Sequence, residues 1–138
     1  MILKEIQRKL CNNFSIIGIE TPELDARIIL KEVLSLDDKD LILKESLDIS
    51  NEMIEKIIAI ESRRLNGEPI SKIFKKRDFY NSTFVISNDV LDPRPETELI
   101  VEIANNYIDK NEVKNILDLG TGSGCILLSI LKENKMIN

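Results

Sequence analysis

The sequence predicts an α+β chain, in which a small helical bundle is joined by a β-hairpin to the beginning of a doubly wound α/β domain. Three observations predict this fold class. Apolar residues recur every three or four positions in the first half, aromatic and β-branched residues cluster over 78–86, and the apolar segment 116–119 runs into glycines at alternate positions. We expect domains at 1–72 and 93–138, joined by a hairpin linker at 73–92.

The first half contains the signals of three or four amphipathic helices. In the first, the apolar residues share one face. The second should begin at Thr21-Pro22-Glu23, where the threonine hydroxyl can cap the helix and proline suits the first helical position. A short helix is expected near 38–44. A longer one should follow Ser50 and end near Gly67, a residue suited to a left-handed cap. The residues expected to face inward are Ile2, Leu3, Ile6, Leu10 and Phe14, then Leu24, Ile28, Leu30, Val33 and Leu34, then Leu41 and Leu43, and finally Met53, Ile54, Ile57, Ile58 and Leu65.

The pattern changes after Pro69. Residues 78–86 predict a hairpin that turns at Asn81-Ser82, where asparagine tolerates a positive φ. Two prolines keep residues 92–95 extended, and Pro95 can open the next helix. A buried strand is expected at 116–119, and a last helix from about Gly124. The inward residues of the two helices should be Leu99, Ile100, Ile103, Ala104, Tyr107 and Ile108, and then Ile126, Leu127, Ile130 and Leu131.

Composition excludes several classes of function. The net charge is −5 over 138 residues, which disfavours direct binding of nucleic acid by bulk electrostatics. The absence of histidine removes Ser-His-Asp, Cys-His and most zinc-hydrolase mechanisms. Cys11 and Cys125 stand far apart, so neither a disulfide framework nor a zinc site is indicated and we expect a cytoplasmic protein. No apolar run approaches the roughly 20 residues that span a bilayer, so no membrane association is expected.

The segment that carries chemistry is D-x-G-x-G-x-G, formed by Asp118, Gly120, Gly122 and Gly124. Glycines between a strand and a helix let a ligand approach the backbone, and the helix start offers unpaired N–H groups. A dinucleotide fingerprint would need glycine at Cys125, and a phosphate-binding P-loop would need a following lysine. Glycines kept only for a tight turn are the alternative. The spacing resembles the first motif of class I S-adenosylmethionine-dependent methyltransferases.

A second segment narrows the resemblance. Residues 90–102 read Val-Leu-Asp-Pro-Arg-Pro-Glu-Thr-Glu-Leu-Ile-Val-Glu and follow Asp78-Phe-Tyr80. Together they closely resemble the protein-(glutamine-N5) methyltransferases that modify peptide chain release factors. The family's order of parts is also found here: a helical domain, a hairpin, this segment, and a strand with its glycine loop.

The resemblance implies a truncated, Rossmann-like class I methyltransferase domain that uses S-adenosyl-L-methionine and no metal. The implied cofactor-binding residues are Asp118, Gly120, Thr121, Gly122, Ser123, Gly124, Arg94 and Thr97. A solvated turn arginine and an ordinary first-turn threonine are the alternatives for the last two.

The implied function is methyl transfer to the glutamine side-chain amide of a peptide chain release factor, which would be the protein partner bound by the helical domain. The family's Asn-Pro-Pro-Tyr motif is absent from this sequence, so no catalytic residue is assigned and this chain is expected to be inactive alone. Another class I methyltransferase and a non-catalytic partner-binding fragment remain as alternatives. A lone strand leaves its backbone groups unpaired, so the C-terminal third should be poorly ordered alone, or covered by another chain or by self-association.

Overall fold

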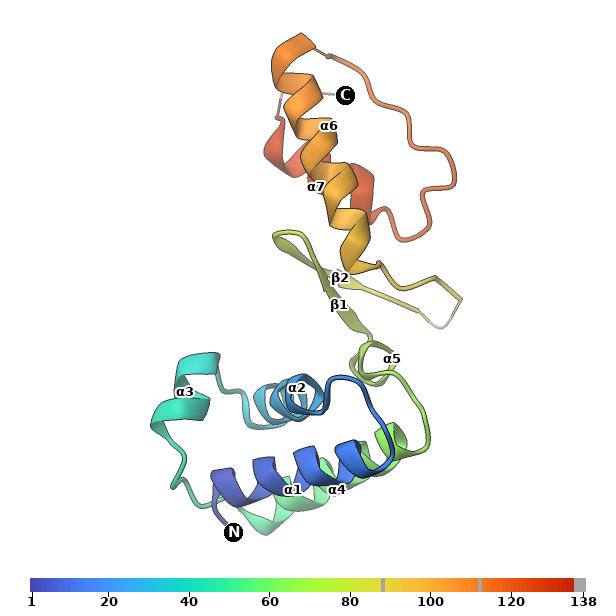
Figure 1. The fold of residues 1–138 in the computed structure, drawn as a ribbon. Helices are drawn as coiled ribbons and strands as arrows, with labels where there is room; N and C mark the ends of the chain where they lie inside the picture. The colour runs from blue at the N-terminus through green and yellow to red at the C-terminus, as the bar shows by residue number, and fades with distance from the viewer. Residues whose placement is uncertain (88, 112, 136–138) are drawn as a thin grey trace. The chain divides into compact units, whose positions relative to one another are not determined.

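The computed structural model describes residues 1–87, 89–111 and 113–135 (Figure 1). The chain divides into two compact units, Met1–Ile73 and Phe74–Asn138. The described residues are mostly helical, with a two-stranded antiparallel sheet, so the α+β class is confirmed at this level. Within these residues no parallel, Rossmann-like sheet is formed.

The first unit is a bundle of α1 (Leu3–Ile16), α2 (Pro22–Leu34), α3 (Asp38–Leu43) and α4 (Asn51–Leu65), followed by α5 (Ile70–Phe74). Helix α2 packs against both α1 and α4. The buried apolar side chains repeat at helical spacing, as the sequence predicts for α1. The core consists of Leu3, Ile6, Leu10, Phe14, Ala26, Ile29, Leu30, Leu41, Ile49 and Ile57.

The helix ends follow the expected capping chemistry with one exception. The Ser50 hydroxyl accepts a hydrogen bond from the Met53 N–H at 3.4 Å at the start of α4. Gly67, at φ +90°, follows the end of the same helix in the left-handed region. Pro22 occupies the first turn of α2, but Thr21 makes no side-chain cap, contrary to our prediction. Its backbone, at φ −127° and ψ 60°, departs from the extended conformation typical of a capping residue.

Polar groups enter the first unit where the sequence pattern alone gives no signal. Asp25 is only 7% exposed, and it accepts a hydrogen bond from Arg64 Nε of α4 at 2.7 Å. Glu61, also 7% exposed, accepts one from Asn13 Nδ2 of α1 at 2.7 Å. These pairs join α4 to both of the other long helices. Because Asp25 lies inward, the apolar face of α2 is rotated, and Leu24 is exposed rather than buried.

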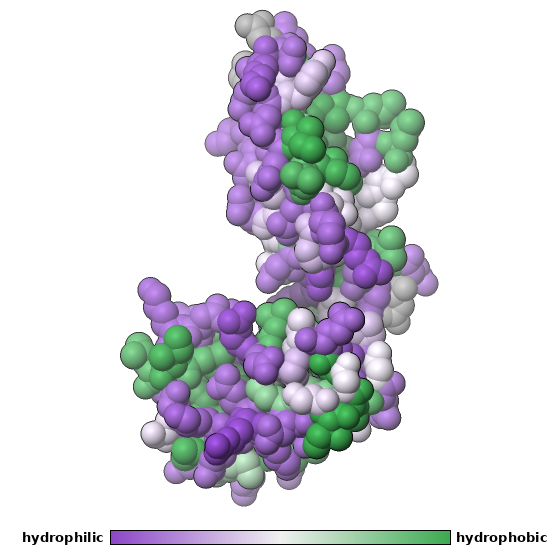
Figure 2. All heavy atoms as spheres, in the orientation of Figure 1, coloured by the Kyte–Doolittle hydropathy of each residue, from purple (hydrophilic) through white to green (hydrophobic). Residues whose placement is uncertain are grey.

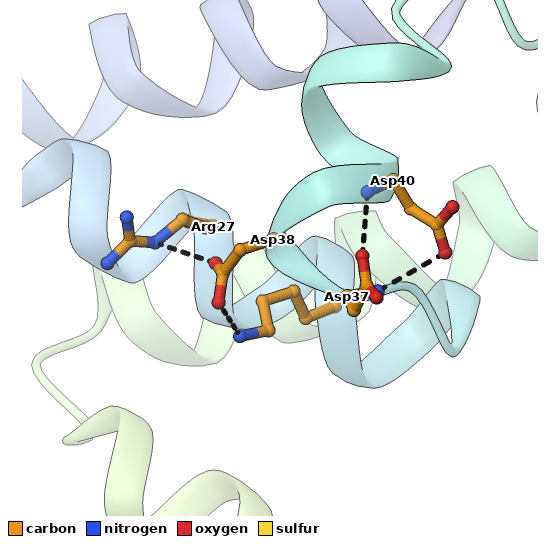
Figure 3. A network of polar contacts seen from close by, with 5 residues as sticks. Arg27, Asp37, Asp38 and Asp40 are labelled. Carbon is orange, nitrogen blue, oxygen red and sulfur yellow. Dashed lines mark hydrogen bonds and ion pairs between the residues drawn. The ribbon is translucent and has the colours of Figure 1, made fainter.

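An ion-pair cluster joins α2 to α3 at the surface (Figure 3). Asp38 contacts Lys31 Nζ at 2.6 Å and Arg27 Nε at 3.5 Å. The hydrogen bond from Lys31, aided by the charges of Lys31 and Arg27, lowers the pKa of Asp38. Asp37 caps α3 by accepting from the Asp40 N–H at 2.7 Å. The cluster therefore fixes where the short helix begins.

The second unit opens with a hairpin of β1 (Lys76–Phe79) and β2 (Ser82–Val85), in which Phe79 pairs with Ser82. The hairpin is confirmed, but the residue at positive φ is Tyr80, at +49°, rather than Asn81. The Tyr80 N–H donates to Glu98 Oε1 at 2.9 Å, which helps hold this unfavourable backbone conformation. Tertiary contact, rather than local preference, selects the turn residue.

Two helices complete the second unit. The short 3₁₀ turn η1 (Pro95–Thr97) leads into α6 (Glu98–Asn111), which packs beside α7 (Cys125–Glu133) (Figure 1). Their shared core includes the hairpin residue Phe79. It consists of Phe79, Val101, Ile108, Cys125 and Ile130.

The predicted buried strand at 116–119 is wrong. Residues 113–118 carry no regular secondary structure, and Leu117 and Leu119 are 81% and 84% exposed. A parallel strand needs neighbouring strands for its backbone hydrogen bonds, and the described residues supply none. The expected inner face of α6 is exposed for the same reason, because no sheet covers Ile100, Ile103 and Tyr107.

Candidate functional site

The glycine loop preceding α7 keeps all three of its glycines in the left-handed region. Gly120, Gly122 and Gly124 have φ of +76°, +56° and +75°. A Cβ added at Gly120 would meet nothing within 4 Å, and one at Gly122 would meet only the Gly120 carbonyl oxygen at 3.9 Å. Backbone conformation, rather than crowding inside the protein, therefore requires glycine at these two positions. The space beside Gly120 and Gly122 is open to a ligand, whereas a Cβ at Gly124 would meet Leu128 Cδ1 at 3.3 Å.

The loop ends at the start of α7, a helix with no side-chain cap. Gly124 is the N-cap residue, and its N–H donates to the Thr121 carbonyl at 2.8 Å. Thr121 is exposed and Ser123 is half-buried. An uncapped helix start presents backbone N–H donors and the positive end of the helix dipole. This end of the loop suits oxygen acceptors on a ligand.

Asp118, at the other end of the loop, carries a carboxylate oxygen without a partner. Its Oδ2 atom is buried and accepts no hydrogen bond within the described part of the chain. A buried polar atom without a partner is costly, and such atoms are often completed by a ligand. An ammonium group or a hydroxyl on a ligand would supply the missing donor. The loop thus offers backbone donors at one end and a carboxylate acceptor at the other.

Arg94 and Thr97 lie on the segment that leads into α6. Arg94 is exposed in an extended conformation before η1, and its carbonyl accepts a hydrogen bond from the Thr97 N–H at 3.0 Å. Across the residues that the structure describes, no hydrogen bond or ion pair joins either side chain to the glycine loop. The structure thus shows Asp118 and the glycines in one loop, and its described residues show no polar contact from Arg94 or Thr97 to that loop.

Sequence reasoning missed a polar network that holds the hairpin turn. Besides the bond from Tyr80 to Glu98, Asn105 Nδ2 donates to the Tyr80 hydroxyl at 3.4 Å, and Asn134 Nδ2 donates to Asn105 Oδ1 at 2.7 Å. Lys132 Nζ of α7 donates to the Asn81 carbonyl at 2.5 Å. The hairpin turn, α6 and α7 are thereby tied into one body. The only one of these residues that the sequence singled out is Glu98, in the Pro-Arg-Pro-Glu-Thr-Glu segment. An acidic residue in the first turn of a helix is common, so Glu98 did not indicate this network.

The described residues contain neither a cluster of metal-ligating side chains nor a helix that could cross a membrane. No group of three or more potential metal-ligating side chains occurs among residues 1–87, 89–111 and 113–135. In the same residues, no helix combines the length and the apolar character needed to cross a bilayer.

Comparison with known proteins places these features in a family. Residues 5–74, about half of the chain, match the model of the PrmC N-terminal domain. The release factor glutamine methyltransferase of Coxiella burnetii is 35% identical over 131 residues, which cover 95% of this chain and 47% of the relative. The release factor glutamine methyltransferase of Burkholderia pseudomallei is 43% identical over 110 residues, which cover 80% of this chain and 39% of the relative. A bifunctional methyltransferase of Rickettsia typhi is 33% identical over 149 aligned positions, which cover 95% of this chain and 29% of the relative.

The chain thus spans about half the length, or less, of these curated relatives. The matched region begins in the helical bundle and, in the longer alignments, takes in nearly the whole chain. The resemblance inferred from the glycine loop and the Pro-Arg-Pro-Glu-Thr-Glu segment is confirmed. This chain belongs to the release factor glutamine methyltransferase family.

Proposed function

We propose that this chain supplies the release-factor-binding unit and the cofactor loop of a methyltransferase. That enzyme transfers a methyl group from S-adenosyl-L-methionine to the glutamine side-chain amide of a peptide chain release factor. The single observation that carries the cofactor assignment is the glycine loop, with three left-handed glycines and a buried, unpartnered carboxylate oxygen on Asp118. The family relationship supports the substrate class.

The residues of the loop fit the cofactor by their chemistry. Asp118 would accept a hydrogen bond from the ammonium group of the cofactor, while Gly120 and Gly122 leave the backbone bare for close approach. Thr121 and Ser123 contribute the remaining polar groups of the loop. When bound, the cofactor supplies an electrophilic methyl group on a sulfonium. The chain's own residues bind and orient that group, and positioning is the main source of rate for such a transfer.

Arg94 and Thr97 are assigned a supporting role beside the same cofactor. The exposed Arg94 guanidinium is suited to pair with the methionine carboxylate, and the Thr97 hydroxyl to add a hydrogen bond. Because neither side chain has a polar contact with the loop among the described residues, their contribution requires the methyltransferase domain to be complete. The helical unit 1–72 carries substrate recognition, and the chain alone is inactive.

Ligand binding to the isolated chain tests the cofactor assignment. In saturation-transfer NMR with S-adenosyl-L-methionine, the wild-type chain should give a weak but specific signal. Asp118→Asn should weaken it about tenfold or more, because a hydrogen bond to a charged group contributes about 1.5–3 kcal/mol. The matched control is Asp109→Asn, which removes the same charge from an exposed position on α6 and should bind like the wild type.

Two results would each contradict one part of the proposal. Equal binding of S-adenosyl-L-methionine by the Asp118 and Asp109 variants would show that the loop does not bind the cofactor. Transfer of radiolabelled methyl groups to a release factor by this chain alone would contradict the proposed inactivity. The second result would leave the cofactor assignment intact.

A further inference from the structure

The turn between β1 and β2 is held by side chains from two helices. The Tyr80 N–H donates to Glu98 Oε1 of α6 at 2.9 Å. Lys132 Nζ of α7 donates to the Asn81 carbonyl at 2.5 Å and to the Ser82 hydroxyl at 2.9 Å. Asn81 is exposed and its two neighbours are half-buried, and much of the surface drawn in Figure 2 is hydrophilic. Polar contacts from outside the hairpin therefore fix this turn.

The conformation of the turn is one that its own residues do not favour. Tyr80 has φ +49°, in the left-handed region that a bulky side chain rarely adopts. Inside the turn, the Ser82 N–H donates to the Tyr80 carbonyl at 2.9 Å. A backbone strained in this way persists where the surrounding structure determines it. The contacts from α6 supply that support: Glu98 accepts the Tyr80 N–H, and Asn105 Nδ2 donates to the Tyr80 hydroxyl at 3.4 Å.

The two helices that hold the turn carry the segments assigned to the cofactor. Glu98 is the first residue of α6 and directly follows Thr97, whose N–H donates to the Arg94 carbonyl at 3.0 Å. Helix α7 begins directly after Gly124, the last glycine of the loop. Fixing the start of α6 therefore fixes the backbone of Arg94 and Thr97, and fixing α7 fixes the end of the glycine loop.

We propose that Glu98 is a positioning residue of the cofactor site. By accepting the Tyr80 N–H, its carboxylate places the start of α6 on the hairpin turn, to which Lys132 attaches α7. The turn thereby sets where residues 94–97 stand relative to the glycine loop. This role differs from that of an ordinary first-turn acid, which acts by its charge on the positive end of the helix dipole. The inference rests on the proposed function, because it takes both segments to bind S-adenosyl-L-methionine.

Two substitutions of Glu98 separate the acceptor from the charge. Glu98→Gln removes the charge and keeps an acceptor oxygen, whereas Glu98→Met removes both. Hydrogen exchange of the Tyr80 amide should stay within about threefold of the wild type in Glu98→Gln and become at least about tenfold faster in Glu98→Met. Backbone scalar couplings should show positive φ at Tyr80 in the wild type and Glu98→Gln, and negative φ in Glu98→Met. The matched control is Glu102→Met, at an exposed position of the same helix, which should behave like the wild type.

Residual dipolar couplings measure the positioning itself. In the wild type and in Glu98→Gln, the amides of the hairpin, α6 and α7 should fit one common alignment tensor. In Glu98→Met, the orientation of α6 relative to the hairpin should change, and in Lys132→Met that of α7 should change. A contact that only adds stability would leave these orientations as they are in the folded chain. If Glu98→Met does not fold, Glu98→Gln decides the question, because loss of protection at the Tyr80 amide in that variant overturns the proposal and its retention supports it.

The failure of this proposal is distinguishable from that of the proposed function. Equal acceleration of Tyr80 exchange in Glu98→Gln and Glu98→Met would assign the effect to the charge and overturn the positioning role. Unchanged φ at Tyr80 and unchanged dipolar couplings in Glu98→Met would overturn it as well. None of these measurements needs the cofactor. Saturation-transfer NMR with S-adenosyl-L-methionine on the wild type and Asp118→Asn tests the proposed function separately.

Discussion

Replacing Arg64 by methionine should destabilise the first unit far more than replacing the adjacent Arg63. Arg64 Nε lies 2.7 Å from Asp25 Oδ2, and the two side chains are 20% and 9% exposed. Methionine preserves most of the aliphatic stem and removes the guanidinium, so the carboxylate of Asp25 is left buried without a cation. Breaking a buried pair in this way costs about 3–5 kcal/mol. Because water still reaches Arg64, we expect the lower end, about 3 kcal/mol.

Arg63→Met is the matched control on the same helix. Arg63 also pairs with a carboxylate, Glu68, but these side chains are 49% and 36% exposed. Surface pairs contribute about 0–1 kcal/mol, so the loss should be small. Both substitutions shorten the side chain by the same amount. The two variants therefore differ mainly in the burial of the partner that remains.

The free energies of opening are measured by native-state hydrogen exchange at amides in α1 and α4, which report on the first unit alone. A double-mutant cycle with Asp25→Asn isolates the pair, since removing the buried charge should recover most of the loss in Arg64→Met. A loss within about 1 kcal/mol of that for Arg63→Met would refute the reasoning. In that case the carboxylate is hydrated despite its position between the helices.

Three further predictions concern both units. Asp38, whose pKa is lowered by Lys31, stabilises the folded state above its ordinary pKa of about 3.9, and this contribution disappears as pH falls through the lower, folded-state value. Acid titration of unfolding should therefore show a shallower loss of stability for Asp38→Asn than for the wild type. Phe79 is only 1% exposed, so Phe79→Ala should lower the free energy of unfolding of the second unit by about 3–5 kcal/mol. Hydrogen exchange should then accelerate at the amides of α6 and α7 and stay unchanged at those of α1. Gly122→Ala should lower the free energy of unfolding of the second unit by about 1–2 kcal/mol, as measured by thermal denaturation, because alanine is strained at the φ of +56° that residue 122 adopts. An unchanged stability would mean that the loop relaxes to negative φ.

The sequence by itself determined the helical elements and the family. In α1, the spacing of Leu3, Ile6, Leu10 and Phe14 places all four on one face, and a helix with such a face is stabilised wherever apolar partners are available. The glycine loop could also be recognised from the sequence. Its backbone is left-handed at alternate positions, and glycine adopts that conformation without a steric penalty. These features depend on local geometry, which the sequence encodes directly.

Only the tertiary structure decided which polar groups are buried and which apolar groups are exposed. Asp25 enters the first unit because Arg64 approaches from another helix, and Tyr80 adopts positive φ because Glu98 receives its N–H. Residues 116–119 have the composition of a strand but do not form one. Strand formation depends on hydrogen bonds to neighbouring strands, and a segment's own sequence cannot supply those partners.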